Sequence, residues 1–472
     1  MILQIVKWWK RKGGASELLK TAFPLILSSA SSTIQQVVDR LFLSWYSSDA
    51  LAAAMPAGML NFLLQSFFLG TAGYASTFIA QYYGAKIEED NGAVIFSSIL
   101  ISLFGSIFIA LTVPFAPYLF KFFGHTDSVL YNEISYFSIL SLGSCGFLFA
   151  NSLSCFFSGR GNTWPVFLVS ILSTIINSIL NYLLIFGKLG LPSLGIKGAG
   201  IATVITGIIS CFIYLLFLLS KPYKKICSYW KKPFFRKELL LRLLHFGYPA
   251  GLQFFLDMIG WTIVIILIGR IGKIELASSN IAFNINTFAF MPMIGIGIAV
   301  SILVGQYLGK NEPKIAEQTT WNGFLLTFIY MASVSTIYIL LPQIFIKPYI
   351  LYSKIPQETE ILKKTASIIL KFVGIYSIFD TMNVIFPSAL KGAGDTLFVM
   401  LTNGIISLIL LIIPVSVAII KFNSDIILVW IIITLYIIVS GFIYLIRFIQ
   451  GKWKNMRVIG TEIPSFTIPG PK

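Results

Sequence analysis

The sequence is poor in charged residues, in histidine and in cysteine. Asp, Glu, Lys and Arg make up 11% of its 472 residues, whereas soluble globular proteins contain about 25%. Too few charged side chains are present to cover a water-facing surface, which excludes a soluble enzyme, a disordered chain and a secreted disulfide scaffold. Its only two histidines, His125 and His245, exclude a histidine metal cluster, and the four cysteines lack the spacing of a metal or redox motif.

Hydrophobic residues dominate the chain. They account for 56% of it, and the mean hydropathy is +0.84. Apolar runs long enough to cross a bilayer recur along the sequence and are separated by glycine, proline, asparagine and charged residues. We therefore predict an all-α polytopic membrane protein. Its twelve transmembrane helices are expected at residues 18–46, 51–81, 91–116, 130–157, 164–186, 197–219, 243–269, 275–306, 315–343, 363–389, 397–419 and 427–449.

The net charge of +16 comes from basic residues in the short loops between the apolar runs. The termini and the loops after even-numbered helices hold about twice as many Lys and Arg residues as the other loops. This asymmetry predicts an integral protein of the plasma membrane (the inner membrane of a bacterium) with both termini in the cytoplasm. The partners expected of these loops are anionic lipids and not nucleic acid.

The two halves of the chain repeat each other. A shift of 225 residues aligns Pro24 with Pro249, Asn61 with Asn286, Gln81 with Gln306 and Gly84 with Gly309. A shift of 233 residues aligns the turn at residues 159–163 with the turn at 392–396. Parallel six-helix repeats are typical of transporters that bind substrate between their halves near the midplane. A channel or a receptor would not require this repeat.

The repeat divides the chain into two pseudo-symmetric six-helix bundles. The predicted parts are an interfacial N-terminus (1–17), an N-terminal lobe (18–219), a basic linker (220–242), a C-terminal lobe (243–449) and a flexible cytoplasmic tail (450–472). Both Gly-x-Gly turns lie between apolar helices, and no Gly-rich phosphate loop is present. We therefore expect neither an enzyme nor a cofactor.

Three carboxylates lie deep within the long apolar runs of the predicted membrane helices, away from the helix ends: Asp39, Asp257 and Asp380. A charge at such a position costs roughly 2.5–3.5 kcal/mol on insertion scales. Amides three or four residues away share the same helix faces, which suits a wet cavity or an ion site: Gln35, Gln36, Gln253 and Asn383, with Asn177 and Asn181 as a similar pair. The repeat does not duplicate the acids, which favours function over scaffold. The alternative is a buried salt bridge to Arg40, Arg270 or Lys371.

Four prolines lie within predicted helices, where each removes a backbone donor and favours a bend. Bends of this kind would serve as hinges between two access states, although proline is common in membrane helices anyway. The hinge candidates are Pro24, Pro249, Pro292 and Pro387.

Several dispersed motifs resemble the multidrug and toxic compound extrusion (MATE) family, and within it the NorM-like branch. The segment from Asn177 through Asn181 to Pro192 is similar to the fifth helix of the family. Asn284, Met291-Pro292 and the run ending at Gln306 resemble its eighth-helix signature. Val38-Asp39 and the stretch from Asp380 to Thr396 resemble its first-helix and tenth-helix acidic motifs.

The resemblance implies a secondary antiporter that exports hydrophobic, often cationic drugs or toxic compounds in exchange for Na⁺ or H⁺. It implies coupling roles for Asp39, Asp257 and Asp380, with Asp257 and Asp380 as candidate Na⁺ ligands and Asn284 lining the cavity. Asp257 stands eight positions after Pro249, where the family commonly has Glu. Some relatives carry Asp in place of Asn181 and use it for protons, so this sequence favours Na⁺. We expect a monomer.

The alternative function is a lipid-linked oligosaccharide flippase of the same superfamily. Such a protein handles an anionic pyrophosphate and would line its cavity with Arg and Lys. The charges identified within these helices are mainly acidic, which favours the antiporter.

Overall fold

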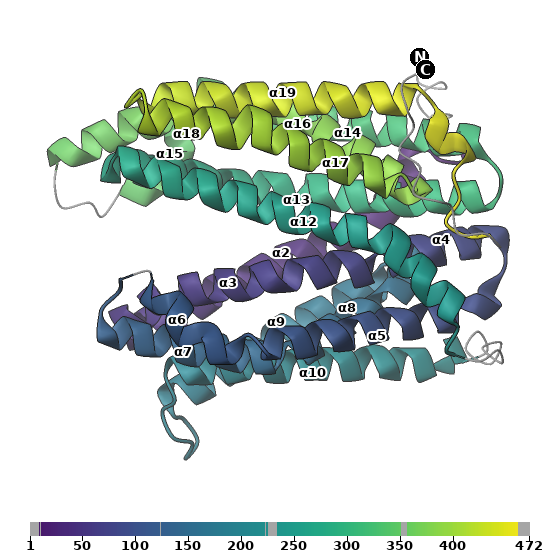
Figure 1. The fold of residues 1–472 in the computed structure, drawn as a ribbon, viewed down its shortest axis with the longest axis horizontal. Coiled ribbons are helices and arrows are strands. Elements are labelled where there is room, and N and C mark those ends of the chain that lie inside the picture. The colour runs from purple at the N-terminus through teal and green to yellow at the C-terminus, as the bar shows by residue number, and fades with distance from the viewer. Residues whose placement is uncertain are drawn as a thin grey trace.

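The computed structural model describes residues 9, 11–122, 124–221, 223–224, 234–350 and 356–460. These residues form two helical bundles, which we call the N-lobe and the C-lobe (Figure 1). The predicted all-α class is confirmed, since no strand occurs in the described parts of the chain.

The N-lobe contains six helical rods, several of which are broken. Its elements are α2 (Ala15–Tyr46), α3 (Ser48–Gly73), α4 (Ala75–Ala85), η1 (Glu88–Asp90), α5 (Asn91–Ala110), η2 (Val113–Phe115), α6 (Ala116–Lys121), α7 (Asp127–Leu142), α8 (Ser144–Gly159), α9 (Trp164–Phe186) and α10 (Ile196–Leu219).

The C-lobe repeats this arrangement with six further rods. Its elements are α12 (Lys237–Ile271), α13 (Lys273–Gly309), α14 (Pro313–Leu340), α15 (Pro342–Ile350), α16 (Pro356–Ala393), α17 (Thr396–Ile406), the π-helix η3 (Ser407–Ile412), α18 (Ile413–Ile420), α19 (Ile426–Ile449) and the 3₁₀ turn η4 (Lys452–Asn455).

Ten of the described helices are long and apolar enough to cross a membrane, and the pair α7 and α8, bent by 44°, makes an eleventh span. The remaining rod, α2, is 32 residues long and carries a polar stretch in its middle (residues 28–36). At the α7–α8 break, a Cβ on Gly143 would lie 2.1 Å from the Val204 side chain of α10, so only glycine permits this approach.

The lobes converge at one end of the molecule, the end that carries α4, and diverge at the other (Figure 1). The convergent end depends on two glycines that the repeat aligns. A Cβ on Gly84 would lie 2.0 Å from the Gln306 carbonyl oxygen, and one on Gly309 would lie 2.1 Å from that of Gln81. Since α4 and α13 touch backbone to backbone here, the crossing is itself pseudo-symmetric.

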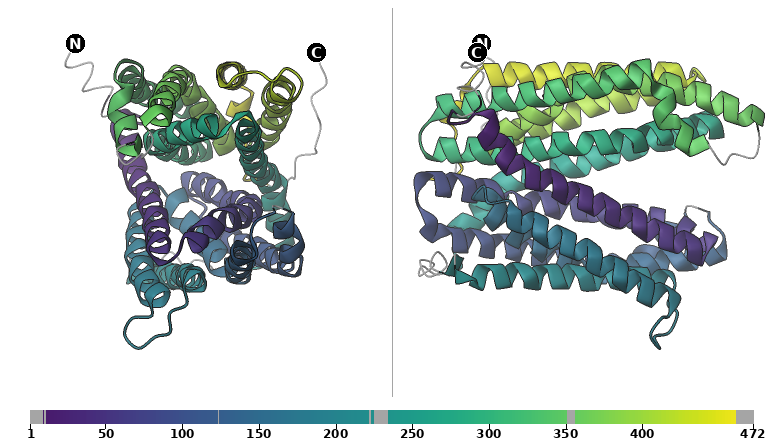
Figure 2. Two further views of the ribbon diagram at one scale, coloured as in Figure 1. Left: turned by 90° about the vertical axis from the view of Figure 1, so that its left-hand side faces the viewer. Right: turned by 180° about the vertical axis from the view of Figure 1, so that it is seen from behind.

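The first helix of each lobe begins in the other lobe. Leu18 of α2 packs in a core formed by C-lobe helices, and its repeat equivalent Leu243 of α12 packs in a core of N-lobe helices. Farther along, Leu43 and Val264 lie in cores built within their own lobes. Figure 2 shows α2 crossing from one bundle to the other. Large apolar cores with members from both lobes therefore lie at the convergent end.

Two expected boundaries differ in the structure. Helix α12 begins at Lys237, so the last six residues of the predicted linker 220–242 are helical; residues 225–233 lie outside the described residues. The prediction of a flexible tail is wrong for residues 451–460. They form a segment that we call the strap, in which Trp453 and Val458 are fully buried. The Trp453 ring stacks on Phe448, with 5.0 Å between ring centroids.

The strap contacts both lobes. The Val458 amide donates to Gln81 Oε1 of α4 at 2.9 Å, and the Arg242 guanidinium of α12 donates to the Gly460 carbonyl. Lys454 forms an ion pair with Glu317 of α14 at 2.7 Å. The folded part of the C-terminus thus lies across the convergent end; residues 461–472 lie outside the described residues.

Candidate functional site

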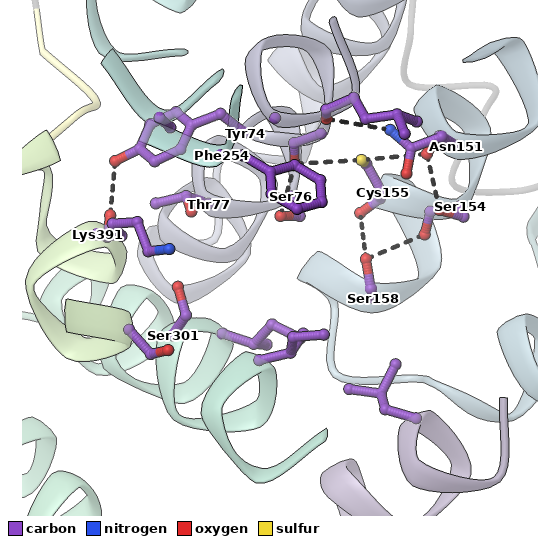
Figure 3. A pocket seen from close by; sticks show the side chains of 18 of the residues that line it. Tyr74, Ser76, Thr77, Asn151, Ser154, Cys155, Ser158, Phe254, Ser301 and Lys391 are labelled. Carbon is purple, nitrogen blue, oxygen red and sulfur yellow. Dashed lines mark hydrogen bonds between the residues drawn. The ribbon is translucent and has the colours of Figure 1, made fainter. Parts of the chain in front are cut away.

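A cavity of about 620 Å³ lies between the lobes, next to their convergent end (Figure 3). Its volume falls within the range of about 300–1,000 Å³ that is typical of small-molecule sites. Its walls come from α2, α3, α4, α8 and α9 of the N-lobe and from α12, α13 and α16 of the C-lobe.

The cavity lining is amphipathic. Aliphatic and aromatic side chains such as Leu25, Phe62, Phe147, Phe254 and Ile298 supply apolar surface. Hydroxyl and amide groups alternate with them, including Ser28, Ser29, Thr77, Asn151, Ser154, Ser158, Ser301 and Ser388. Among the described lining residues, Asp257 is the one carboxylate and Lys391 the one cation. Such a lining suits a flat hydrophobic molecule that carries a few polar groups.

A group of polar side chains in the C-lobe, which we call the C-lobe cluster, centres on Asp257 of α12. Its Oδ2 accepts from Gln253 Nε2 at 3.0 Å, and its Oδ1 accepts from Asn403 Nδ2 of α17 at 2.7 Å. The Gln253 Oε1 accepts in turn from Lys391 Nζ at 3.3 Å. Since an ammonium only donates and a carboxylate only accepts, Gln253 bridges the two charges in a single orientation.

Asp380 on α16 is not among the described residues that line the cavity. It is near enough to Asp257 for the two carboxylates to interact electrostatically, and Asn383 is its hydrogen-bond partner. The Asn383 amide also donates to the Ile437 carbonyl at 2.8 Å. Tyr436 of α19 lies close to both acids. The predicted pair Asp257 and Asp380 is thus brought together by α12 and α16.

A second group of polar side chains, which we call the N-lobe cluster, is smaller than the C-lobe cluster and consists of Asp39, Asn177 and Asn181. Asp39 Oδ1 accepts a short hydrogen bond from Asn181 Nδ2 of α9, which also donates to Asn177 Oδ1 at 2.9 Å. Asn177 and Asn181 are fully buried, and Asn177 Nδ2 and Asn181 Oδ1 have no protein partner. The predicted asparagine pair therefore serves Asp39, although the two segments are 142 residues apart in sequence.

The three acids do not form the buried salt bridges to Arg40, Arg270 or Lys371 that were the alternative explanation for them. None of the ion pairs of the described residues includes Asp39, Asp257 or Asp380. Arg40 and Lys371 are exposed on the surfaces of α2 and α16, and Arg270 lies exposed near the end of α12.

The other predicted residues lie apart from these clusters. Gln35 and Gln36 precede Asp39 on α2, but Asn181 rather than either glutamine is the side-chain partner of that acid. Asn284 is exposed on α13 and donates to the Asn280 carbonyl of its own helix at 2.8 Å. The four hinge candidates all lie inside long helices: Pro24 in α2, Pro249 in α12, Pro292 in α13 and Pro387 in α16.

Sequence reasoning missed Asn403, Lys391 and Tyr436. Asn403 is a polar residue in an apolar helix, a signal that was present, but its partner Asp257 lies on another helix. Lys391 directly precedes a Gly-x-Gly turn, so the sequence predicts a lysine in a loop, yet its side chain lines the cavity. The π-helix that follows Asn403 had no recognised signal, and such π segments are frequent at functional sites.

The C-lobe cluster offers ligands for a monovalent cation. Asp257 with its partner Asn403, and Asp380 with its partner Asn383, supply carboxylate and amide oxygen atoms, which alkali and alkaline-earth cations prefer. No group of three His, Cys, Asp or Glu side chains that would hold a multivalent metal occurs in the described residues.

Comparison with known proteins decides the family. The MatE family model matches the chain twice, over residues 24–183 and 249–418, which are the two halves of the repeat. The chain is a member of the MatE family. The family and fold predicted from its motifs are confirmed, and this NorM-like MATE chain is an integral membrane transporter and not an enzyme.

The chain is 25% identical to the probable multidrug resistance protein NorM of Thermotoga maritima over 94% of both proteins. It is 30% identical to the probable multidrug resistance protein YoeA of Bacillus subtilis over 65% of this chain and 67% of that one. Among solved structures, an outward-facing multidrug resistance MATE family transporter superposes with a TM-score of 0.82 and 17% identity, covering 95% of this chain and 98% of the other. That likeness shows the MATE fold.

Proposed function

We propose that this MATE chain exports hydrophobic, often cationic drugs or toxic compounds through the cavity between its lobes, in exchange for Na⁺. The observation that carries the proposal is the position of Asp257, which lines the substrate-sized cavity and lies near enough to Asp380 for the two carboxylates to interact electrostatically. Multidrug resistance proteins among its relatives support the substrate class.

Asp257 can connect substrate and ion because both compete for one carboxylate. In the described state its oxygens accept from the amide groups of Gln253 and Asn403. An amide presents either an N–H or a carbonyl oxygen, so rotation of Asn403 would turn a donor to Asp257 into a cation ligand. Binding Na⁺ would then remove the negative charge that a cationic substrate needs, and the substrate would leave.

A proton could occupy the same carboxylates, and H⁺ is the alternative coupling ion. Either ion carries one charge inward, which gains about 2.3 kcal/mol per 100 mV of membrane potential when the exported compound carries no net charge. Asn181 stands where a second N-lobe acid would be needed for a proton-sharing pair, which supports Na⁺.

Alternating access requires the convergent end to open, and two of the hydrogen bonds that close it are related by the repeat. The Gln81 amide donates to the Gly392 carbonyl of the C-lobe turn at 3.0 Å, and its repeat equivalent Gln306 donates to the Gly159 carbonyl of the N-lobe turn at 2.9 Å. Each lobe thus closes on the Gly-x-Gly turn of the other. With cytoplasmic termini, the described state would be open to the outside.

The flippase alternative is not favoured. A pyrophosphate site would need several cations, and Lys391 is the one cationic residue among the described residues that line the cavity.

The test is ethidium efflux from proteoliposomes under an imposed Na⁺ or pH gradient. We expect efflux driven by Na⁺ in wild-type protein and in the control Asp127→Asn, which changes an exposed acid at the start of α7. We expect loss of that efflux in Asp257→Asn. Efflux driven by a pH gradient in Na⁺-free buffer and unchanged by added Na⁺ would contradict Na⁺ coupling, and normal efflux by Asp257→Asn would contradict the site.

A further inference from the structure

Lys391 places an ammonium group in the wall of the cavity. It lies at the end of α16, where its backbone carbonyl accepts from the Tyr74 hydroxyl of α3–α4 at 2.6 Å. This bond fixes the lysine backbone against the opposite lobe. Figure 3 shows the side chain extending from that point into the space that Thr77 and Ser301 also line.

The ammonium has donor capacity left for a ligand. Of its three N–H groups, one donates to the neutral Gln253 Oε1 at 3.3 Å. No carboxylate of the described residues lies within ion-pair distance of it. Asp257 is near enough to attract it, but the oxygens of Asp257 are held by Gln253 and Asn403. Lys391 is half-buried, and a partly desolvated cation without an ion-pair partner gains from binding an anion.

The charge is confined to one half of the repeat. The shift of 233 residues that aligns the Gly-x-Gly turns aligns Lys391 with Ser158, and both side chains line the cavity. A scaffold requirement of the turn would be expected in both halves. The lysine is therefore a feature of the cavity and its contents.

The groups around Lys391 indicate what kind of anion fits. Ser301, Ser388 and Thr77 add hydroxyl donors beside the ammonium, which suits the two oxygens of a carboxylate. Phe254 and Phe62, with their ring centroids 6.0 Å apart, supply an aromatic wall on the same cavity. The Asp257 carboxylate, on the other side of Gln253, faces the same space and suits a cationic group.

We propose that Lys391 is a specificity-determining residue whose ammonium binds the carboxylate of aromatic zwitterionic substrates, while their cationic end faces Asp257. This inference rests on the proposed export of small molecules through the cavity. It assigns the two charges of such a substrate to two named residues of one cavity, because the cavity lining holds one group of each sign among the described residues.

The test compares a fluoroquinolone with its methyl ester, which keeps the rings and the amine but lacks the carboxylate. In proteoliposomes with a Na⁺ gradient, wild-type protein should have a lower KM for the acid than for the ester. Lys391→Met should raise the ratio of acid KM to ester KM at least about 10-fold, as expected for losing a charge-assisted hydrogen bond. Lys391→Arg should largely keep the wild-type ratio.

Lys371→Met is the matched control, because Lys371 is an exposed lysine on the same helix. It should leave the ratio unchanged. An unchanged ratio of acid KM to ester KM in Lys391→Met would overturn the inference. So would a change in Na⁺ dependence that is equal for acid and ester, because the lysine would then act only by its charge on Asp257. If Lys391→Met fails to fold, a wild-type KM for the acid equal to or above that for the ester is sufficient to overturn it.

Failure of the underlying function looks different. Wild-type protein that exports ethidium, the acid and the ester under neither gradient would contradict export itself. Export of ethidium and the ester without an advantage for the acid would contradict only the role of Lys391.

Discussion

The two lobes share a scaffold and differ in their buried polar groups. In the N-lobe, the Asp39 carboxylate accepts from Asn181 of α9, which also donates to Asn177. In the C-lobe, the Asp257 carboxylate and the Lys391 ammonium both bond to Gln253 in the cavity wall, and Asp380 is near enough to interact electrostatically with Asp257. The repeat therefore preserves packing and gate contacts, while the charged groups that line the cavity belong to one half. We infer that ion coupling resides mainly in the C-lobe and that Asp39 supports it from across the cleft.

The largest expected effect is from removing the C-lobe acids. Asp257→Asn and Asp380→Asn should each reduce gradient-driven efflux by roughly 10- to 100-fold, because each removes charge-assisted bonds worth about 1.5–3 kcal/mol. Asp39→Asn should also impair coupled efflux. Asparagine nearly matches aspartate in shape and is cheaper to bury, so melting temperatures should stay close to wild type. Normal efflux by all three variants would show that these acids are not used for coupling.

The next test gives the N-lobe a second carboxylate. In Asn181→Asp, the donor that now binds Asp39 becomes an acid, and two carboxylates at this distance share a proton. Efflux should acquire a dependence on the pH gradient that wild-type protein lacks. The variant should melt at a lower temperature at high pH, by an amount corresponding to about 1–3 kcal/mol, and recover at low pH. Efflux with unchanged ion dependence would show that the N-lobe cluster does not contribute to coupling.

A smaller effect is expected from the two gate glutamines. Gln81→Ala removes bonds to the C-lobe turn and to the strap, whereas Gln306→Ala removes one bond to the N-lobe turn. Each lost bond to a buried backbone group should shift the gate by about 1 kcal/mol, so Gln81→Ala should open the convergent end more. Spin labels at positions 87 and 310, in a variant whose native cysteines are replaced, would measure the opening. Equal distances in both variants would contradict the ranking.

Much of the fold was predictable because each helix is specified by a local apolar run. The positions of the acids within helices, and the pairing of Gln253 with Asp257 one turn apart, also follow from helical periodicity. The partners that complete each cluster do not follow from helical periodicity. Asn403 and Lys391 meet Gln253 and Asp257 only because α12, α16 and α17 cross at particular heights, which no single-helix pattern records.

The breaks in the helices and the folded strap were missed for a related reason. Gly143 and Gly84 look like ordinary helix glycines until the neighbouring helix that needs the missing Cβ is known. The tail is polar and proline-rich in sequence, yet Trp453 and Val458 find apolar pockets that exist only after both lobes have met. Tertiary contacts over hundreds of residues decide these features.

The exchange of first helices between lobes bears on how the protein is made. Leu18 emerges from the ribosome long before the C-lobe helices α13 and α16 that will bury it, so the early N-lobe carries an uncovered apolar surface. Leu243 can be buried as soon as it is synthesised, because its N-lobe partners are already in the membrane. Assembly is therefore unequal in time although the fold is nearly symmetric. The N-lobe must be shielded by lipid or by a chaperone until synthesis has passed α16, and the strap is the last described segment to be added.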